Sequence, residues 1–376
     1  MGARLRWLIA LVGLIGSACG ADEQAFVGQL EASVVYGSDD RIEVYNHPSA
    51  SLREIARASV VALIPTNQIE RNADGLYVLF AVTLKNSKDL CDGQLFSDQP
   101  TAARCSGVLI DNDLVLTAGH CMRTQRDCDD TSFVFNYHLD GPSQLAAIED
   151  DDVYSCAEVI LREETSTSSP PTPDFAIVRL DRTVSGGHRP AEVRPATEAL
   201  ATGELVTMIG FGSGIPGKID SGGEVADPRS DMLDFFVVSS DAFAGHSGSP
   251  VFDSLDRLAG HLVAGLAPDY VRALEGSCFE VNTFAESEAG EAIHYFAPIV
   301  AELCAQGLGG DNLCEETACE GEPCGMDSPG VDNPTTGVAA PAETGCTAAS
   351  VDPTGAMTWP LLALVALALR ARRRVV

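Results

Sequence analysis

The stretch Cys105-Ser-Gly-Val-Leu-Ile-Asp-Asn-Asp-Leu-Val-Leu-Thr-Ala-Gly-His120-Cys121 holds two short apolar runs separated by a polar Asp-Asn-Asp turn. This pattern predicts a strand, a turn and a second strand, followed by a tight Ala-Gly turn that presents His120. Cys105 and Cys121 bracket the hairpin, and in an exported chain such cysteines can staple it. The stretch therefore predicts antiparallel β structure that carries a histidine at its end.

Similar apolar runs bounded by Gly, Asp, Asn and Pro recur along the middle of the chain, at residues 59–64, 76–83, 175–180, 205–211, 233–238 and 258–266. Helical spacing occurs only after residue 292, and Pro298 suits the first turn of a helix that ends near Ala305. We expect one all-β domain with a short C-terminal helix over residues 57–304. Residues 20–56 would comprise a propeptide and an N-terminal segment.

Composition excludes several classes of protein. The chain has 376 residues, of which 45% are hydrophobic, so a sizeable core is possible and a collagenous or wholly disordered chain is excluded. Its 54 acidic and 24 basic residues give a formal net charge of −30, and no basic face is visible. Nucleic acid is therefore not an expected partner, because phosphate binding needs clustered Lys and Arg.

The N-terminus predicts export. Arg4 and Arg6 precede an apolar run and then small residues, which is the order of a secretory signal peptide over residues 1–19. Cleavage would follow Gly20, or would precede Cys19 if the signal is that of a lipoprotein. The terminal segments are the parts of the chain that we expect to meet a membrane.

The C-terminal region divides into a linker and a tail. Residues 305–345 are rich in Gly, Pro, Thr, Asp and Glu and contain no Lys or Arg, which predicts an acidic linker. Its cysteines fit a small disulfide knot better than a zinc site. In the tail, residues 346–376, an apolar run ends in an Arg cluster. This tail resembles the MYXO-CTERM sorting tails of myxobacterial surface proteins, and the resemblance implies that Cys346 is a processing and attachment point. An ordinary membrane helix is the alternative.

Two further segments carry chemistry beside the His120 hairpin. Asp174 stands at the start of an apolar strand, and Ser247 lies in the glycine-flanked run Gly245-His-Ser-Gly-Ser-Pro250. A serine becomes a nucleophile when an imidazole takes its proton, and the imidazole needs a carboxylate to fix its tautomer. Backbone N–H groups of Gly245 and Ser247 can stabilise the oxyanion. These residue types predict acyl transfer by His120, Asp174 and Ser247.

The strings LTAGHC, DFAIVRL and GHSGSP occur in the order His, Asp, Ser, and the chain resembles a chymotrypsin-fold serine endopeptidase. It is most similar to the bacterial glutamyl-endopeptidase-like branch, whose nucleophile loop runs GNSGSPVF. The segments Gly37-Ser-Asp-Asp-Arg41 and Ile209–Ile219 add to this resemblance. It implies two six-stranded antiparallel barrels with the triad between them, and a disulfide between Cys105 and Cys121. It also suggests removal of a propeptide ahead of Val34 or Val35.

The chain departs from that family at the residues that set specificity. Ala242 and Leu262 stand where the glutamyl branch has the groups that select Glu, although His261 is one residue away. Asp241 stands six residues before Ser247, where trypsin-like enzymes bind Arg or Lys, and Gly265 would be an open pocket wall. Asp241 could therefore bind basic substrate residues, or it could cap its turn and point away.

His246 replaces the Asn of the family's loop, and it could titrate near neutral pH or form a structural hydrogen bond. The acidic clusters at residues 127–130 and 149–152 lack the spacing of a calcium loop, so we expect solvated loops. No metal or cofactor is expected. The leading hypothesis is an exported or surface-displayed serine endopeptidase acting on proteins or peptides, and the alternative is an inactive protease-fold module that binds at the cell surface.

Overall fold

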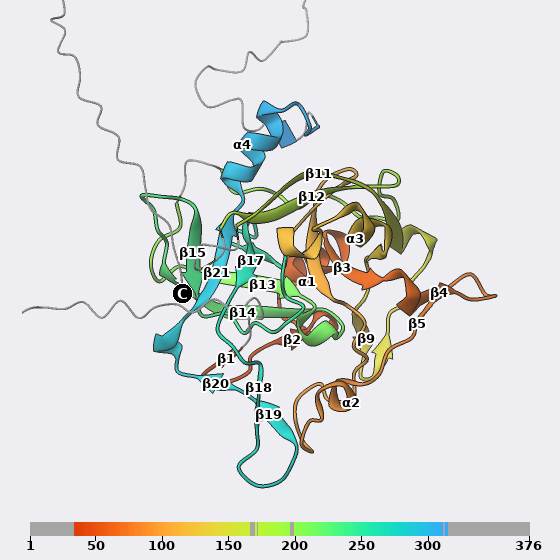
Figure 1. The fold of residues 1–376 in the computed structure, drawn as a ribbon, viewed down its shortest axis with the longest axis vertical. Helices are drawn as coiled ribbons and strands as arrows, with labels where there is room; N and C mark the ends of the chain where they lie inside the picture. The colour runs from red at the N-terminus through yellow and green to blue at the C-terminus, as the bar shows by residue number, and fades with distance from the viewer. Residues whose placement is uncertain (1–33, 166–169, 171, 196–198, 311–312, 315–376) are drawn as a thin grey trace, which may run out of the picture. The chain divides into compact units, whose positions relative to one another are not determined.

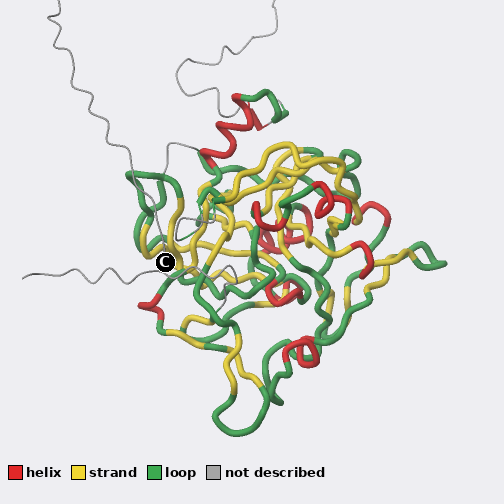
Figure 2. Tube along the Cα trace, in the orientation of Figure 1, coloured by secondary structure: helices red, strands yellow, loops and turns green. Residues whose placement is uncertain are grey.

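The structure is a computed structural model that describes residues 34–165, 170, 172–195, 199–310 and 313–314. Strands and loops make up most of this part of the chain, and its helices are short (Figure 2). The predicted signal peptide, most of the linker and the sorting tail lie outside the described residues, as do Cys19 and Cys346. Within the described residues, no helix is long and apolar enough to cross a membrane.

Six antiparallel strands close the first barrel, in the order β11-β12-β7-β6-β3-β8. Figure 1 labels β3, β11 and β12 of this barrel. Their interior is apolar because the buried residues of these strands are mainly Val, Leu, Ile and Phe. The strands are β3 (Val60–Pro65), β6 (Cys105–Asp111), β7 (Leu114–Thr117), β8 (Thr131–Val134), β11 (Val153–Glu164) and β12 (Asp174–Leu180).

The second barrel follows in sequence. The order is β13-β16-β17-β21-β15-β14, and pairing of β13 with β14 closes this barrel too. The strands are β13 (Leu205–Gly210), β14 (Lys218–Asp227), β15 (Phe235–Val238), β16 (Pro250–Phe252), β17 (Leu258–Ala264) and β21 (Glu291–Tyr295). The chain thus folds into two six-stranded antiparallel barrels with a C-terminal helix, as predicted.

Short strands outside the two barrels form additional pairs. β2 (Ile42–Glu43) adds to the edge of β14, and β1 (Val35–Tyr36) pairs in parallel with β20 (Thr283–Phe284). Three further hairpins complete the set, formed by β4 (Ile69–Arg71) with β5 (Tyr77–Leu79), β9 (Leu139–Gly141) with β10 (Gln144–Leu145), and β18 (Tyr270–Arg272) with β19 (Phe279–Val281).

The helices are α1 (Ala50–Ala58), α2 (Leu84–Lys88), α3 (Gln125–Asp129) and α4 (Ala297–Ala305). α4 matches the predicted helix, with Pro298 in its first turn and Ile299, Val300 and Leu303 buried. The nine-residue α1 was not predicted. Ser49 caps it by accepting a hydrogen bond from the Leu52 amide, and Leu52 and Ala56 are buried.

The compact part of the chain is longer at both ends than the predicted 57–304. At the N-terminal end, Val34 is fully buried and forms a β-bridge with Ala242. After α4, a disulfide joins Cys304 to Cys314, and the Gly310 amide donates to an Asp111 carboxylate oxygen at 2.7 Å. Residues on both sides of the predicted domain therefore pack against the barrels.

Candidate active site

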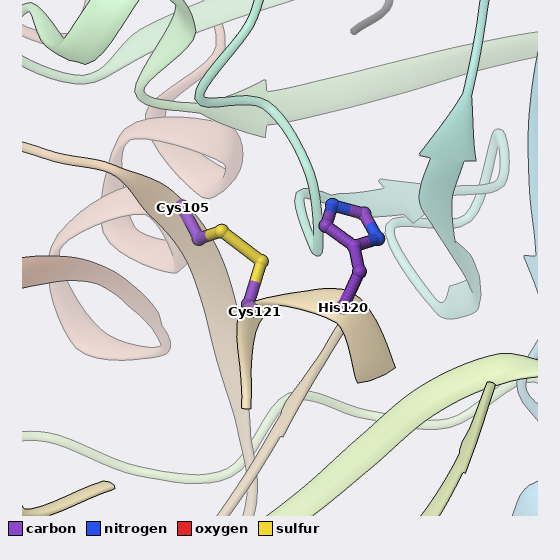
Figure 3. A group of neighbouring side chains, drawn as sticks. All are labelled: Cys105, His120 and Cys121. Carbon is purple, nitrogen blue, oxygen red and sulfur yellow. A yellow bond between two sulfur atoms is a disulfide. The ribbon is translucent and has the colours of Figure 1, made fainter. Parts of the chain in front are cut away.

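His120 lies in a single 3-10 turn, Gly119–Cys121, directly after β7. Gly119 leaves no room for a side chain, because a Cβ there would lie 2.3 Å from the Glu163 carbonyl oxygen. The neighbouring Cys121 is joined by a disulfide to Cys105 at the start of β6, as the family resemblance implied (Figure 3). The turn is thus held from both sides, which fixes the backbone of the histidine.

Asp174 is fully buried at the first residue of β12. Its Oδ1 accepts the backbone N–H of His120 at 2.9 Å, and its Oδ2 lies 2.7 Å from His120 Nδ1. A carboxylate can only accept from the ring, so Nδ1 carries the proton. In the neutral imidazole this leaves Nε2 as the free acceptor, which is the tautomer that a general base needs.

His261 supports Asp174 from the second barrel. Its ring is buried, and Nε2 donates to the Asp174 carbonyl oxygen at 3.0 Å. Burial lowers the pKa of His261 to about 3, with the nearby His294 contributing in the same direction, so the ring is neutral. His261 therefore holds the backbone of Asp174 in place through a hydrogen bond. The sequence did not indicate this contact, because it depends on the packing of β17 against β12, which are far apart in the chain.

Ser247 lies in the loop between β15 and β16, and the first barrel holds this loop in place. The Ser106 amide donates to the Ser247 carbonyl oxygen at 2.8 Å, and the Ser106 hydroxyl donates to the Gly245 carbonyl oxygen at 2.8 Å. Ser247 and His120 line one cavity of about 570 Å³. Among the described residues no hydrogen bond joins the Ser247 hydroxyl to the His120 ring, although such contacts often tighten only when substrate binds.

The backbone at Gly245 needs a glycine. Its φ is +105°, and a Cβ there would lie 2.7 Å from the Phe211 carbonyl oxygen. Within the described part of the chain, the amides of Gly245 and Ser247 donate to no protein group, whereas those of His246 and Gly248 donate to Phe243 and Leu262. Two amide donors beside Ser247 are therefore free to stabilise an oxyanion.

His246 is buried in the same loop, where Nδ1 accepts the Phe243 amide at 3.0 Å. Burial lowers the pKa of His246 well below its ordinary value, and the charges of Arg41 and Lys218 add to this effect. The structural hydrogen bond is thus the interpretation that the geometry favours, because a neutral ring is needed to accept at Nδ1.

Asp241 is buried, and its carboxylate is engaged by the N-terminal segment. Its oxygens accept the amides of Tyr36 at 2.8 Å and Asp40 at 3.1 Å, and its own amide donates to Asp220 at 2.7 Å. Burial raises the pKa of Asp241 to about 7. Asp241 does not line the cavity of His120 and Ser247. Of the two interpretations from the sequence, these hydrogen bonds favour a structural carboxylate.

Gly265 follows β17 and also lies outside that cavity. A Cβ on Gly265 would lie 1.6 Å from Oε2 of Glu291, so a buried carboxyl group stands directly against the predicted pocket wall. Ala242 and Leu262, the positions of the glutamyl-selective groups, are both buried in the apolar core of the second barrel.

The cluster of Cys105, His120 and Cys121 has ligand atoms within 4.8 Å of one another (Figure 3). Both sulfur atoms belong to the disulfide, so the cluster offers no thiolate to a metal ion. Two other disulfides, Cys91–Cys278 and Cys128–Cys156, fix the connectivity that the sequence left open for those residues. The acidic runs 127–130 and 149–152, predicted as solvated loops, lie partly in short helical segments. Asp127 is inside α3 and accepts the Thr124 amide at 2.8 Å, and Asp150 begins a 3-10 turn and pairs with Arg71.

The sequence and the structure were compared with known proteins. Residues 105–260 match the model of the trypsin-like peptidase domain family. Among solved structures, a Glu endopeptidase in complex with MPD is 16% identical, with a TM-score of 0.41, and the match covers 73% of this chain and 99% of that one. A kallikrein-related peptidase 10 in complex with Zn²⁺ is 14% identical, with a TM-score of 0.38 and coverage of 55% and 89%. No curated protein matches the sequence.

The chain contains a trypsin-like peptidase domain with the chymotrypsin-type double barrel. Such a domain implies protein substrates and suggests a serine peptidase. The four disulfides among the described residues indicate an extracellular protein.

Proposed function

We propose that the protein is an exported serine endopeptidase in which Ser247 is the nucleophile, His120 the general base and Asp174 the residue that orients His120. The observation that carries the proposal is the Asp174–His120 pair, 2.7 Å apart, at a cavity that Ser247 also lines. The Asp174 carboxylate holds the proton on Nδ1, so Nε2 is left as the acceptor that can take the proton of the Ser247 hydroxyl.

In the acylation step, Ser247 Oγ attacks the carbonyl carbon of the peptide while His120 Nε2 takes the hydroxyl proton. The carbonyl oxygen becomes an oxyanion, and the amides of Gly245 and Ser247 donate to it. The C–N bond then breaks, and the protonated His120 gives its proton to the leaving amine. The acyl group remains on Ser247.

In the deacylation step, a water molecule takes the place of the amine, and His120 Nε2 removes its proton. The hydroxide attacks the acyl carbon, the bond to Ser247 Oγ breaks, and the proton returns to that oxygen. Ser247 is regenerated, and the carboxylic acid product leaves.

A fluorophosphonate probe tests the proposal, because it phosphonylates a serine only where the base and the oxyanion donors are in place. We expect the secreted protein to be labelled and to hydrolyse casein, and we expect Ser247→Ala and His120→Ala to abolish both. Ser249→Ala is the matched control. Ser249 lies in the same loop, and its buried hydroxyl has no hydrogen-bond partner in the described structure, so this variant should still be labelled.

The alternative, a binding module without catalysis, makes the opposite prediction. A folded, secreted protein that takes up no probe and cleaves no casein would leave only that function. Folding is checked independently by the cooperativity of thermal unfolding.

The proposal includes the terminal segments. Processing at or near Cys19 and attachment through Cys346 would display the peptidase at the cell surface, whereas loss of the tail without attachment would release it. Mass spectrometry of the mature termini separates these outcomes. The same measurement shows whether a propeptide is removed ahead of Val34 or Val35, and a mature N-terminus at residue 19, 20 or 21 would exclude that removal.

A further inference from the structure

Basic side chains gather in the cavity beside Ser247, although the chain as a whole is strongly acidic. Three basic residues and one acid line this cavity of about 570 Å³, namely Lys88, Arg104, Arg123 and Asp127. The chain carries 54 acidic and 24 basic residues, so an excess of cations at one site is unexpected from its composition. The proposed acylation and deacylation steps use none of these side chains, so their place in the cavity needs another explanation.

Two of the three cations have no carboxylate partner within the described residues. The Lys88 ammonium lies 5.9 Å from the centroid of the Tyr270 ring, and Arg104 is exposed, but neither forms an ion pair there. Most other basic side chains of the described structure are already paired, as in Arg41–Asp39, Arg71–Asp150, Lys85–Asp92, Arg179–Asp113 and Arg229–Asp234. Lys88 and Arg104 can therefore bind an anion that enters the cavity.

The third cation belongs to a group with an excess of positive charge. Arg123 Nε lies 3.1 Å from both carboxylate oxygens of Glu164, and Arg162 pairs with the same carboxylate. Two guanidinium groups therefore share one acid. Asp127, the only acid among the described residues that line the cavity, already accepts the amide and the hydroxyl of Thr124 at 2.8 and 2.9 Å. The net charge of the cavity lining is thus positive.

The position of His120 indicates which part of a substrate meets these cations. In the proposed acylation step His120 gives its proton to the leaving amine, so the amine nitrogen must lie against the His120 ring. The sulfur atoms of the Cys105–Cys121 disulfide lie within 4.8 Å of a nitrogen of this ring (Figure 3), and Cys121 Sγ is 3.9 Å from the Ser247 carbonyl oxygen. The peptide on the amine side of the scissile bond therefore passes the disulfide.

Arg104 and Arg123 flank that disulfide in the sequence. Arg104 immediately precedes Cys105, and its backbone is fixed because its amide donates to the Leu63 carbonyl oxygen at 2.9 Å. Arg123 follows Cys121 by two residues. Among the described residues that line the cavity none belongs to β17, the strand bonded to the nucleophile loop. The cations thus lie on the first-barrel side of the cavity, along the path of the leaving peptide.

We propose that Arg104 and Lys88 give the peptidase a preference for glutamate or aspartate at the first or second residue on the amine side of the scissile bond. The inference rests on the proposed serine endopeptidase function and concerns the peptide that leaves, not the residue whose carbonyl is attacked. A carboxylate there gains charge-assisted hydrogen bonds from two cations that no carboxylate of the described chain occupies. Arg104 suits this role because a planar guanidinium can bind a carboxylate through two parallel N–H groups.

The test uses three internally quenched peptides built on one sequence that the enzyme cleaves, selected by digesting a peptide library. The first carries glutamate at the first residue of the amine side, and the second carries it at the second residue. The third has glutamine at both positions and its glutamate at the far acyl end. All three have the same net charge, so repulsion by the acidic protein acts on them equally. We expect kcat/KM to be about tenfold higher for the better of the first two than for the third, as for two partly exposed charge contacts.

Variants of the cations show whether they cause the preference. In the double variant Lys88→Gln, Arg104→Gln the ratio should fall to within about twofold of one. Arg104→Glu should reverse the charge preference, so that lysine at that substrate position is cleaved better than glutamine. Arg189→Gln is the matched control, because it removes one cation from an exposed pair with Glu54 outside the cavity, and it should keep the native ratio.

Fluorophosphonate labelling of Ser247 separates the two levels of the proposal. A protein that is not labelled contradicts the endopeptidase function itself. A labelled protein that cleaves the three peptides equally well, or whose preference survives the loss of both Lys88 and Arg104, overturns the role of the cations alone. A preference for the glutamate at the acyl end would overturn it as well.

Discussion

At the scale of single residues, Asp174 makes three contacts that all act on His120 or on its support. Its two carboxylate oxygens accept the backbone N–H and the ring of His120, and its carbonyl oxygen accepts from His261. The carboxylate is fully buried, so no water competes for these bonds. One side chain therefore sets the position, the tautomer and the orientation of the proposed base.

The first prediction concerns Asp174→Asn. An amide has one accepting oxygen, and its NH₂ group would face one of the two His120 donors, which favours the wrong ring tautomer. We expect kcat to fall about 10⁴-fold while the fold remains intact. Hydrolysis of a peptide ester and circular dichroism measure the two properties. A fall of less than about tenfold would contradict the role given to Asp174.

The second prediction concerns the stability of Glu291→Gln. Burial raises the pKa of Glu291 in the folded protein. As the pH rises above the ordinary pKa of a glutamate, the side chain therefore ionises in the unfolded chain before it ionises in the folded one, and this lowers the free energy of unfolding. Glu291 Oε1 accepts hydrogen bonds from the Tyr36 hydroxyl at 3.2 Å and the Leu266 amide at 3.3 Å, and a neutral glutamine can still accept both. The variant should match the native protein at pH 4 and exceed it at pH 8 in the free energy of unfolding.

Urea denaturation at several pH values measures this difference, and Glu280→Gln, at an exposed site, should show no such trend. A stability difference that shrinks with rising pH would mean that Glu291 is held as a carboxylate in the folded protein.

The residues of the proposed triad could be located from the sequence because each lies in a local string with a characteristic pattern of Gly, Ser, Thr and apolar residues. His261 could not, since it has no local signal. The role of His261 depends on its contact with Asp174, 87 residues away. Asp241 shows the converse, because its spacing from Ser247 suggested a pocket while Tyr36 and Asp40 occupy its carboxylate.

At the scale of elements, the hairpin β6–β7 delivers His120, and the Cys105–Cys121 disulfide closes a segment with a sequence separation of 16. The third prediction is that replacing both cysteines by alanine costs about 3 kcal/mol of stability through loop entropy. It should also slow fluorophosphonate labelling, because the turn that carries His120 loses one of its supports.

The disulfide Cys128–Cys156 is the matched control, with a sequence separation of 28 in the same barrel. Replacing this pair should cost a similar stability but leave the labelling rate of Ser247 within about twofold. Equal slowing in both double variants would attribute the effect to general loosening of the barrel rather than to the turn.

Most apolar runs that predicted strands lie in strands of the structure, because strands such as β6, β7, β12 and β17 are buried along nearly their whole length. The twelve-residue β11 was not predicted, since most of its residues are partly or fully exposed and show no clear alternation. α1 was missed for a related reason: two of its three buried residues are alanines, which add little apolar contrast. The run 76–83 predicted a long strand, but only Tyr77–Leu79 forms one, as β5. Its remaining apolar side chains, such as Phe80 and Val82, are exposed and do not contribute to the core.

The fourth prediction concerns the N-terminal boundary of the domain. A chain that begins at residue 57 lacks β1, β2 and most of α1, and it loses the buried Val34, Val44 and Leu52. It also leaves Asp241 without its two amide donors. We expect the fragment 57–314 to be insoluble or unfolded, whereas 34–314 should unfold cooperatively. Cooperative thermal unfolding of the shorter fragment would show that residues 34–56 are dispensable.

At the scale of the whole molecule, the large negative charge of the chain destabilises the folded state. A formal net charge of −30 acts against folding, because like charges come closer together in the folded state. The cavity beside Ser247 is different in character, since Lys88, Arg104 and Arg123 line it together with a single acid, Asp127. The negative charge of the whole chain and the basic residues that line the cavity are therefore separate features. Salt should change the stability of the protein through the first and the electrostatics of the cavity through the second.

The fifth prediction is that salt stabilises the protein. The Debye length falls to about 10 Å at 0.1 M salt, so raising NaCl from about 10 to 200 mM screens much of the repulsion among surface carboxylates. We expect the midpoint of thermal unfolding to rise by several degrees at pH 7 and to level off above this range. At pH 5 some carboxylates are protonated, the repulsion is smaller, and the same addition of salt should raise the midpoint less. If the midpoint falls with salt at pH 7, attractive surface ion pairs such as Arg71–Asp150 and Arg189–Glu54 outweigh the net repulsion.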